Sequence, residues 1–296
     1  MSPIAEVEGR RIALRNLDKI IYPATGTTKG ELLHYLASTG AVLLPHLRGR
    51  PLAFLRYPDG PDGEKFFTKN PPPGTPAWVK TAEVPRHEGE TARQVLIEDL
   101  ASLMWAANLV VELHTPMWRE ADGYGVADRL VLDLDPGEPA TVVECCAVAV
   151  WLRGRLADDG LRALPKTSGS KGIHLLAPLR PTDSAATTAY AKRIALEAER
   201  ALPGLALHRM KRSLRPGKVF VDFSQNAAAK TTAAPYTPRA RSEPAVSTPV
   251  TWDEIEGCDR PGQLGFRIED IPARLARHGD LLAPLLDPDD AVALPE

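Results

Sequence analysis

Two aspartates, Asp133 and Asp135, close an apolar run that reads Leu-Val-Leu-Asp-Leu-Asp-Pro. In a β-strand successive side chains alternate between faces, so both carboxylates project from one face, about 6 to 7 Å apart along the backbone. Two like charges so placed repel each other unless a cation or a basic side chain lies between them. Hard divalent cations such as Mg²⁺ and Mn²⁺ take oxygen ligands of this kind. The pattern therefore fits either part of a metal site or a strand that runs out into a solvated Asp-Pro turn.

A third acidic residue, Asp222, interrupts another strongly apolar run from Val219 to Phe223. A carboxylate inside such a strand needs a partner that offsets its desolvation. One candidate partner is an arginine from the preceding segment, and the other is a metal ion shared with the aspartate pair. A carboxylate pair together with a remote aspartate on a neighbouring strand is a common construction of two-metal nucleotidyl-transfer sites.

Between these two runs, residues 167–174 form a glycine-rich stretch that is dense in hydrogen-bond donors. Its glycines let the backbone approach a ligand closely, and Ser168, Ser170, Lys171 and His174 supply hydroxyl, ammonium and imidazole groups within one turn. This donor set suits a triphosphate, although Gly-Ser-Lys-Gly also occurs in flexible hairpins. The stretch is not a Walker P-loop, because GxxxxGK[ST] is absent and no helix start follows.

The composition is that of an ordinary globular protein of one large or two smaller domains, with 296 residues, 44% hydrophobic and 25% charged. No apolar run approaches the roughly 18 residues of a membrane span, and the first six residues lack the regions of a signal peptide, so we expect a cytoplasmic location. Three cysteines suit neither a disulfide framework nor a zinc site, and we interpret them as small buried hydrophobes. The net charge of −2 conceals a basic run from Arg209 to Lys218, which is either a solvated face or a nucleic-acid contact.

Helices and strands are intermixed along the chain, with hairpin-like spacings that favour an α+β fold over a doubly wound parallel sheet. Capping boxes at Thr28 and Thr141 mark two helix starts. The helices are expected to begin at Thr28 and to cover residues 99–111, 141–158, 183–202, 252–256 and 272–278. The strands are expected at residues 52–57, 66–69, 95–98, 130–135, 174–178 and 219–223.

Taken in order, Asp-Leu-Asp, Ser-Gly-Ser-Lys-Gly-Ile-His and Val-Phe-Val-Asp resemble the three motifs of the archaeo-eukaryotic primase superfamily. More specifically, the chain is similar to the polymerase domain of bacterial ligase D, the primase-polymerase of non-homologous end joining. Further segments that fit this resemblance lie at residues 16–23, 66–70, 112–116 and 234–241. Pro116 and Met117 depart from it, because many relatives are expected to carry an aromatic residue after His114.

The resemblance implies a primase-like α+β core, in which an RRM-like antiparallel or mixed sheet is flanked by helices, plus a smaller N-terminal α/β part. The expected organisation is a single domain over residues 1–296. It would consist of a DNA-end-binding part (1–125), a metal- and nucleotide-binding core (126–250) and a helical tail (251–296). Whether the chain is a stand-alone protein or a domain excised from a longer ligase D is left open.

The activity implied by the resemblance is that of a template-directed, metal-dependent nucleotidyltransferase of the EC 2.7.7 class, which fills gaps and extends DNA ends with a preference for ribonucleotides. Its substrates would be nucleoside triphosphates and gapped or recessed DNA ends that carry a 5′-phosphate. Ku and an ATP-dependent DNA ligase would be its partners, at the nucleoid and away from any membrane.

The resemblance also implies a role for each matching residue. Asp133, Asp135 and Asp222 would hold two divalent ions, Mn²⁺ or Mg²⁺, that activate the primer 3′-hydroxyl and bridge the nucleotide's phosphates. The nucleotide would contact Ser168, Ser170, Lys171, His174, Gln225 and Arg239. The 5′-phosphate of the recessed end would contact Asn16, Lys19 and Lys29. Template and primer would contact Arg56, Phe66, Phe67, His114 and Arg215.

Two of these assignments also have support from position. Lys29 falls in the first turn of a helix, where its charge would add to free backbone N–H groups, although a solvated lysine is the alternative. Phe66 and Phe67 are adjacent in a strand, so one ring would face inward and the other outward. Stacking of an outward ring on a base is worth roughly 1 to 3 kcal/mol. Trp105 and Trp118 are assigned to the core.

Two other functions remain open at this stage. Leu-Asp-Leu-Asp-Pro superficially resembles the Asp-x-Asp start of haloacid-dehalogenase phosphohydrolases, which requires an early position before a Rossmann-like sheet. A catalytically inactive DNA-end-binding module could instead use the basic run for phosphate contacts.

Overall fold

The computed structural model describes residues 3–86 and 89–295. The chain forms two compact units, each built from three segments. Unit 1 comprises Met1–Thr115, Thr231–Ser247 and Phe266–Arg277, and unit 2 comprises Pro116–Lys230, Thr248–Gly265 and His278–Glu296. The boundaries expected near residues 125 and 250 do not coincide with this interleaved division, and the function assigned to each part stays a prediction.

Unit 2 is built on a five-stranded sheet with the strand order β11-β12-β10-β14-β13. Its strands are β10 (Val126–Pro136), β11 (Leu164–Thr167), β12 (Ile173–Asp183), β13 (Ala206–Leu207) and β14 (Val219–Asp222). Neighbouring strands are antiparallel except β13 and β14, which are parallel. The sheet is thus of the mixed type that was expected, although β11 and β13 were not predicted.

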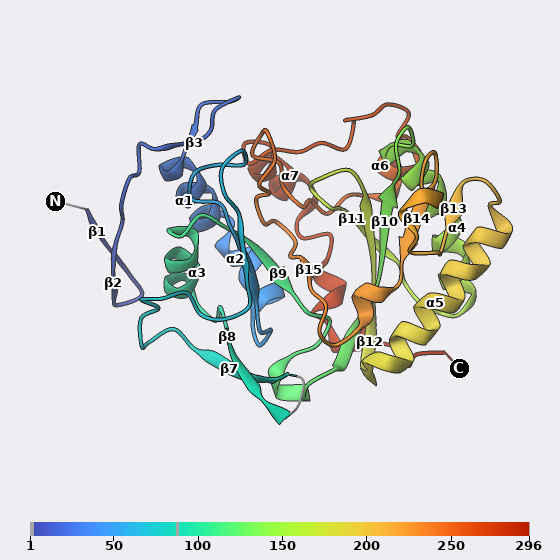
Figure 1. Ribbon diagram of the computed structural model, residues 1–296, viewed down its shortest axis with the longest axis horizontal. Coiled ribbons are helices and arrows are strands. Elements are labelled where there is room, and N and C mark those ends of the chain that lie inside the picture. The colour runs from blue at the N-terminus through green and yellow to red at the C-terminus, as the bar shows by residue number, and fades with distance from the viewer. Residues whose placement is uncertain (1–2, 87–88, 296) are drawn as a thin grey trace. The chain divides into compact units, whose positions relative to one another are not determined.

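Two long helices, α4 (Val142–Asp158) and α5 (Ser184–Ala201), pack against this sheet and against each other (Figure 1). Both predicted helix starts are confirmed, because Thr141 forms a capping box with Glu144 and the Asp183 side chain accepts from Ala185 N. The Cys145 thiol of α4 lies 3.5 Å from the Leu134 carbonyl oxygen, so α4 lies close to the end of β10.

The two faces of β10 separate as the alternation predicts. Leu130, Leu132 and Leu134 are at most 1% exposed. Val131 and Ala127, on the other face, belong to a second buried cluster. The remaining members of that cluster are Met117, Leu164, Leu176, Leu282 and Leu285. Apolar packing therefore supports β10 from both sides up to the point where its aspartates begin.

The remaining short elements of unit 2 are α6 (Trp252–Glu256) and five 3₁₀ turns. The turns are η2 (Glu120–Asp122), η3 (Arg212–Leu214), η4 (Ser224–Asn226), η5 (Ala283–Leu285) and η6 (Pro288–Asp290). Trp118 is 4% exposed, as expected of a core residue.

Unit 1 contains a four-stranded antiparallel sheet with the order β15-β9-β5-β6. Its strands are β5 (Ala53–Arg56), β6 (Phe66–Thr68), β9 (Val111–Thr115) and β15 (Thr232–Ala233). Three hairpins pair β1 (Ile4–Val7) with β2 (Arg10–Ala13), β3 (Ile20–Tyr22) with β4 (Thr27–Thr28), and β7 (Thr81–Pro85) with β8 (Thr91–Val95).

The helices of unit 1 are α1 (Lys29–Ser38), α2 (Gly40–Leu47), α3 (Leu100–Ala107) and α7 (Ile271–His278). The predicted capping box of Thr28 with Glu31 begins α1. Trp105 is 8% exposed and packs on Phe54 in the hydrophobic core, as expected. None of the helices in the described residues is long and apolar enough to cross a membrane.

Some predicted boundaries are wrong. The helix expected over residues 99–111 ends at Ala107, and Val111 already begins β9. Val110, beyond the end of the helix, has a positive φ of 56° and is not helical. Its apolar side chain nevertheless continues the helical pattern of the sequence. The strand expected at 95–98 lies instead at Thr91–Val95, where β8 pairs with β7. Helix α2 was missed because Pro45 lies inside it.

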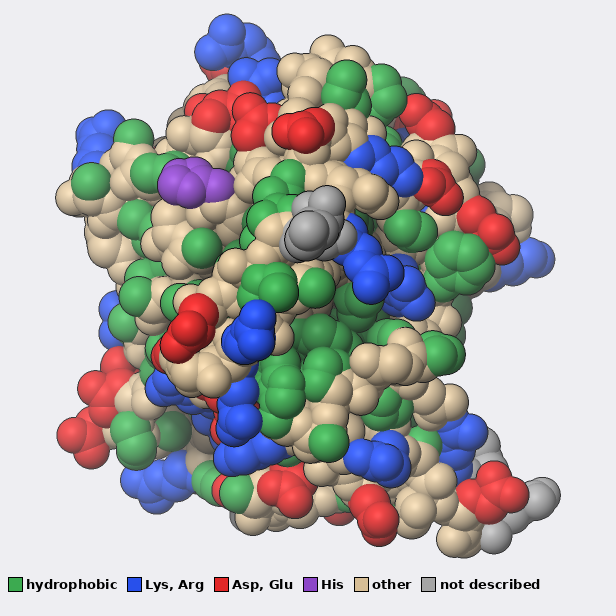
Figure 2. Space-filling view, turned by 90° about the vertical axis from the view of Figure 1, so that its left-hand side faces the viewer, with side chains coloured by type: hydrophobic (Ala, Val, Ile, Leu, Met, Phe, Trp, Pro, Cys, Tyr) green, Lys and Arg blue, Asp and Glu red, His purple; other side chains and the backbone are tan. Residues whose placement is uncertain are grey.

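One face of the molecule shows how charged side chains are distributed. On the face shown in Figure 2, lysine and arginine side chains are interspersed with acidic ones, and hydrophobic side chains gather near the middle. Positive charge is therefore not concentrated over that face.

The three cysteines are buried, as was expected of small hydrophobic residues. Cys145, Cys146 and Cys258 form no disulfide.

Candidate functional site

Asp133 lies in the middle of the five-stranded sheet, with a functional candidate on each side. It is opposite His174 of β12 and opposite Asp222 of β14. Directly opposed residues project from the same face, with Cβ atoms about 4.5 to 5.5 Å apart. Asp135, two residues further along β10, shares this face. Strand register therefore brings the three aspartates to one face of the sheet.

The same row of residues continues to Lys166 of β11, which is opposite His174. Lys166 is 1% exposed and His174 is 4% exposed. His174 Nε2 lies 3.3 Å from Asp133 Oδ1. The order across four strands is therefore Lys166, His174, Asp133, Asp222, with two basic groups beside two acidic ones. Lys166 was missed from the sequence because strand β11 was not predicted, so nothing placed its side chain on this face.

The Asp222 carboxylate is held by residues that follow it directly. Its Oδ1 accepts from Ser224 N at 2.9 Å and from Ser224 Oγ at 2.6 Å, and its Oδ2 accepts from Gln225 Nε2 at 3.0 Å. The alternative partner was a preceding arginine, and among the described residues no arginine of the run 209–218 pairs with Asp222. Arg215 instead approaches Asp135, with 3.9 Å between Nη1 and Oδ2.

Asn226 joins this segment to β10. Its Oδ1 accepts from Val131 N at 2.9 Å, and its Nδ2 donates to Val131 O at 2.7 Å and to Phe223 O at 2.8 Å. The pairing of β14 with β10 ends at Asp222, opposite Asp133, so the Asn226 amide takes the place of a further strand residue. Asn226 is 1% exposed. No role was predicted for Asn226, because its partner lies 95 positions away.

The glycine-rich stretch forms a tight turn between β11 and β12. Ser168 Oγ accepts from Ser170 N and Gly172 N, both at 3.2 Å, and Ser168 N donates to Gly172 O. A Cβ atom at Gly172 would lie only 2.0 Å from Leu134 O. The close approach expected of this glycine is therefore made to β10 rather than to a ligand, and it fixes the turn beside the aspartate pair.

Lys171 extends from this turn into solvent. Its Nζ lies 2.5 Å from a Glu138 carboxylate oxygen, and the two side chains are 61% and 81% exposed. The hydrogen bond from Lys171 lowers the pKa of the Glu138 carboxyl. Exposed ion pairs contribute little to stability, so Lys171 can exchange Glu138 for another anion.

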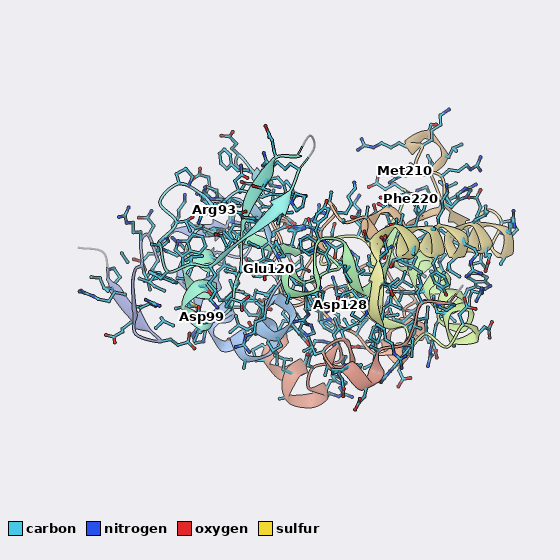
Figure 3. All side chains as sticks on the ribbon, turned by 90° about the horizontal axis from the view of Figure 1, so that it is seen from below. Arg93, Asp99, Glu120, Asp128, Met210 and Phe220 are labelled. Atoms are coloured by element: carbon cyan, nitrogen blue, oxygen red, sulfur yellow. The ribbon has the colours of Figure 1, made fainter. Side chains whose placement is uncertain are left out.

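The basic run expected between Arg209 and Lys218 forms a loop with η3 inside it. Met210, 55% exposed, lies in the outer part of this loop, which leads back to Phe220 on β14 (Figure 3). Arg209 pairs with Glu199 at 2.9 Å. The Arg215 guanidinium lies 3.9 Å from the centroid of the Phe220 ring, on the side of Asp135. The basic residues of this run therefore differ in their surroundings. Arg215 approaches Asp135, whereas Lys211 and Arg212 are exposed to solvent.

The donor set fits Mg²⁺ or Mn²⁺, because the aspartates offer hard oxygen ligands from one face. Within residues 3–86 and 89–295, no three His, Cys, Asp or Glu side chains are already gathered closely enough to hold a metal ion. Asp133 is turned to His174, Asp222 to Ser224 and Gln225, and Asp135 towards Arg215. Each of the three carboxylates therefore has a polar or basic neighbour, and strand register is what brings the three to one face.

Three cations gather at the start of α1 in unit 1. Lys29 is 7% exposed, and the pKa of its ammonium is lowered by burial and by the charges of Lys19 and Arg15. Lys19 pairs with the exposed carboxylate of Asp59 at 2.5 Å. Asn16, also predicted, is exposed with a positive φ of 54°, and its carbonyl accepts from Lys19 N. Arg15 was not predicted from the sequence. A bound anion would relieve the repulsion within this group.

The backbone N–H groups that begin α1 are not free, so this part of the prediction is wrong. Lys29 N donates to Lys19 O and Gly30 N to Leu17 O, each at 2.8 Å, and Glu31 N donates to Thr28 Oγ1 at 3.2 Å. The segment before the helix folds back over its start, which local helix signals do not reveal. Anion binding here would depend on side-chain charge instead.

The residues expected to meet template and primer divide between the units. Phe66 and Phe67 are 43% and 57% exposed, so the prediction that one of the two rings faces inward is wrong. They lie on β6, an edge strand with a neighbouring strand on one side only. The Phe67 and His114 rings meet edge to face, with centroids 6.1 Å apart. Arg56 is opposite Phe66 in register. These four residues lie in unit 1, whereas Arg215 lies in unit 2.

Arg239 also lies in unit 1, whereas the other residues expected to contact the triphosphate lie in unit 2. Its Nε donates to Glu112 Oε2 at 2.9 Å. Glu112 is 2% exposed and pairs in addition with His114. Burial alone would raise the pKa of the Glu112 carboxyl, but the His114 hydrogen bond, the Arg239 charge and the Ala240 N–H outweigh it and lower the pKa to about 2.

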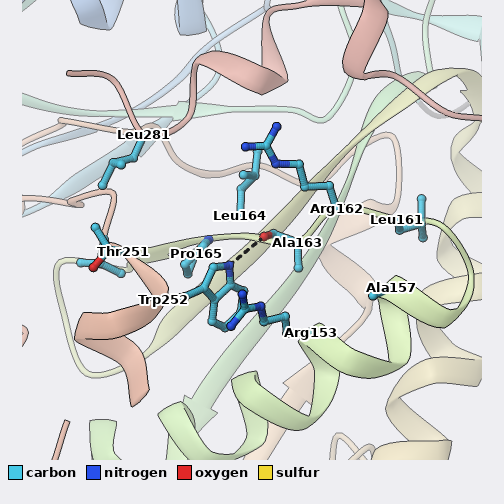
Figure 4. Close-up of a pocket in the computed structure, with 11 residues that line it drawn as sticks. Arg153, Ala157, Leu161, Arg162, Ala163, Leu164, Pro165, Thr251, Trp252 and Leu281 are labelled. Atoms are coloured by element: carbon cyan, nitrogen blue, oxygen red, sulfur yellow. Dashed lines mark hydrogen bonds between the residues drawn. The ribbon is translucent and has the colours of Figure 1, made fainter. Parts of the chain in front are cut away.

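Unit 2 also contains a cavity of about 430 Å³ (Figure 4). Trp252 lines it and donates from Nε1 to Ala163 O at 3.2 Å. Its two arginines, Arg153 and Arg162, pair with Glu256 and Asp290. None of the predicted site residues lines this cavity, so we do not locate the chemistry there.

Comparisons with known proteins point to one family. The family described as "LigD, primase-polymerase domain" matches residues 28–282. The chain is 43% identical to the multifunctional non-homologous end joining protein LigD of Mycolicibacterium smegmatis, over 96% of this chain and 37% of that protein. It is 30% identical to the bifunctional non-homologous end joining protein LigD of Bacillus subtilis, over 91% of this chain and 43% of that protein. The chain thus spans less than half the length of these relatives.

A solved structure, the polymerase domain from Mycobacterium tuberculosis ligase D in complex with DNA, has a TM-score of 0.87 and 42% sequence identity to the chain. The similarity covers 95% of this chain and 99% of the solved one. A haloacid-dehalogenase fold does not agree with this match, nor with a β10 strand that is antiparallel to both of its neighbours.

Proposed function

The chain belongs to the LigD primase-polymerase family, and on this premise we propose that it is a template-directed nucleotidyltransferase that extends DNA ends and fills gaps in bacterial non-homologous end joining. The observation that carries the proposal is the register of the five-stranded sheet. It sets Asp133 opposite Asp222 and puts Asp135 on the same face, beside the donor-rich turn. This is the arrangement of hard ligands and phosphate donors that nucleotidyl transfer needs.

Asp133, Asp135 and Asp222 would hold two divalent ions, which supply Lewis-acid activation of the primer hydroxyl and neutralise charge on the triphosphate. Gln225 and Ser224 orient the Asp222 carboxylate. Buried His174 is a donor directly beside Asp133.

The phosphates of the incoming nucleotide would meet the donors of the glycine-rich turn. Lys171, which is exposed and pairs with an exposed carboxylate, would exchange Glu138 for a phosphate oxygen. The other proposed nucleotide contacts are Ser168, Ser170, His174, Gln225 and Arg239. Ser168 also shapes the turn that carries Lys171.

The DNA end would bind through unit 1. The 5′-phosphate would neutralise the cationic group of Lys29, Lys19 and Arg15, with Asn16 beside it. The exposed rings of Phe66 and Phe67 would stack on the template. Ku and an ATP-dependent DNA ligase are proposed as partners because the relatives are named as end-joining proteins. Ribonucleotide preference, Mn²⁺ use and a cytoplasmic, nucleoid-associated location belong to the same proposal.

Primer extension on a 5′-phosphorylated gap tests the proposal, with ribonucleotides and deoxyribonucleotides compared in Mg²⁺ and in Mn²⁺. Asp133→Ala and Asp222→Ala should each abolish extension and leave binding of the DNA end largely intact, because the cationic group is unchanged. Asp159→Asn, which breaks an ion pair with Arg155 in the same unit, is the matched control and should extend normally. A wild-type protein that binds the end without extending it would instead be an inactive end-binding module.

A further inference from the structure

Glu112 is a buried carboxylate to which no step above gives a task. It lies on β9, opposite Leu55 of β5, and only 2% of its surface is exposed. A charge in the interior of a sheet is costly unless it is paired and hydrogen-bonded. A carboxylate kept there needs strong partners, and the identity of those partners is informative.

Both oxygens of Glu112 are occupied. Oε2 accepts from His114 Nε2 and from Arg239 Nε, each at 2.9 Å, and Oε1 accepts from Ala240 N at 2.7 Å. One carboxylate thus binds two side chains that are 125 positions apart in the sequence. It also binds the backbone N–H of Ala240, the residue after Arg239. Those two side chains, His114 and Arg239, are the ones expected to meet the primer and the triphosphate.

The geometry of each contact restricts its partner. A guanidinium is planar, so fixing Nε of Arg239 also fixes the directions of both Nη groups. The Ala240 N–H contact holds the backbone at the base of the same side chain. For His114, a hydrogen bond from Nε2 to a carboxylate puts a proton on Nε2 and fixes the orientation of the ring. The same ring is nearly perpendicular to the ring of Phe67.

We propose that Glu112 is a positioning residue for nucleotidyl transfer, which orients Arg239 towards the triphosphate and His114 towards the primer terminus through a single carboxylate. The proposal rests on the proposed function, and it adds a residue that touches neither substrate. If Glu112 served stability alone, its replacement would lower stability without a selective change in nucleotide affinity.

Steady-state primer extension with Glu112→Gln separates these two roles. The amide keeps the shape but removes the negative charge, and its NH2 group cannot accept a hydrogen bond as the oxygen that it replaces does. We expect KM for the nucleoside triphosphate to rise about tenfold, whereas affinity for the 5′-phosphorylated end, measured by gel shift, should not change. Asp159→Asn is again the control, because it weakens a different carboxylate network, that of Arg155 and Tyr190, and should leave KM unchanged.

A double-mutant cycle with Arg239→Ala shows whether Glu112 acts through Arg239. In the Arg239→Ala background, Glu112→Gln should raise KM by less than twofold, since the side chain that it orients is gone. Additive effects, or an unchanged KM in folded Glu112→Gln, would overturn the positioning role. If Glu112→Gln does not fold, Glu112→Asp replaces it, because the charge is kept and the reach is one methylene shorter. That variant should raise KM between two- and fivefold, and an unchanged KM would again overturn the role.

Failure of this inference is distinguishable from failure of the proposed function. A wild-type protein without extension activity refutes the function itself. A wild-type protein that extends normally, with variants of Glu112 that match its KM, refutes only the role of Glu112.

Discussion

Asn226→Ala should destabilise the contact between η4 and strand β10, next to the three aspartates. It removes three hydrogen bonds, to Val131 N, Val131 O and Phe223 O. Val131 is 0% exposed, so water cannot replace the amide without opening the sheet. A buried hydrogen bond contributes about 1 kcal/mol, and each buried group left without a partner costs about 1 to 3 kcal/mol. We therefore expect the free energy of unfolding to fall by about 3 kcal/mol.

Urea unfolding followed by fluorescence measures this loss, with Asn108→Ala as the matched control. Asn108 makes one exposed hydrogen bond, to Ala13 O at 3.0 Å, and its replacement should cost less than about 1 kcal/mol. Primer extension by Asn226→Ala should also fall, because Ser224 and Gln225, which hold Asp222, lie in the turn that Asn226 fastens to β10. Equal losses of stability in the two variants would refute the view that Asn226 replaces a strand residue.

Three further predictions concern single side chains. Lys29→Ala should remove the preference for 5′-phosphorylated over unphosphorylated ends in a gel-shift comparison, and an equal loss on both ends would contradict the phosphate contact. Gly172→Ala should lower the free energy of unfolding by about 3 kcal/mol and reduce extension, because its Cβ would lie 2.0 Å from Leu134 O; a variant as stable as the wild type would show that the turn can move away. The pKa of Glu112, about 2 in the folded protein, lies below its ordinary 4.5, so its stabilisation is fully present above pH 4.5 and is lost as the pH falls towards 2. The free energy of unfolding should lose on the order of 3 kcal/mol over that range in the wild type relative to Glu112→Gln, and parallel pH curves for the two proteins would exclude this contribution.

Local patterns were sufficient for the features that depend on neighbours in sequence. Alternation along β10 predicted that Asp133 and Asp135 share a face opposite the leucines. The capping boxes at Thr28 and Thr141 located the starts of α1 and α4. In each case the interacting groups are two or three residues apart, so the sequence contains the geometry.

The residues that were missed are those whose partners are distant. Lys166 joins the site only through the register of β11 with β12, and Asn226 only through Val131. Glu112 looks like one acidic residue in a strand until Arg239 is brought against it. At the end of α3 a local pattern was misleading. Val110 and Val111 continue the apolar spacing of a helix, although the helix has already ended and Val111 begins β9.

The interleaved order of the two units has a consequence for synthesis of the protein. As the chain emerges from the ribosome, residues up to Thr115 appear first, yet β9 still lacks its neighbour β15 and Glu112 lacks Arg239. A carboxylate destined for the interior stays without that compensating charge until more than 120 further residues, including most of unit 2, have been made. Unit 1 should therefore mature late although it begins the chain. A nascent chain arrested before Arg239 should leave β9 accessible to proteases that the finished protein resists.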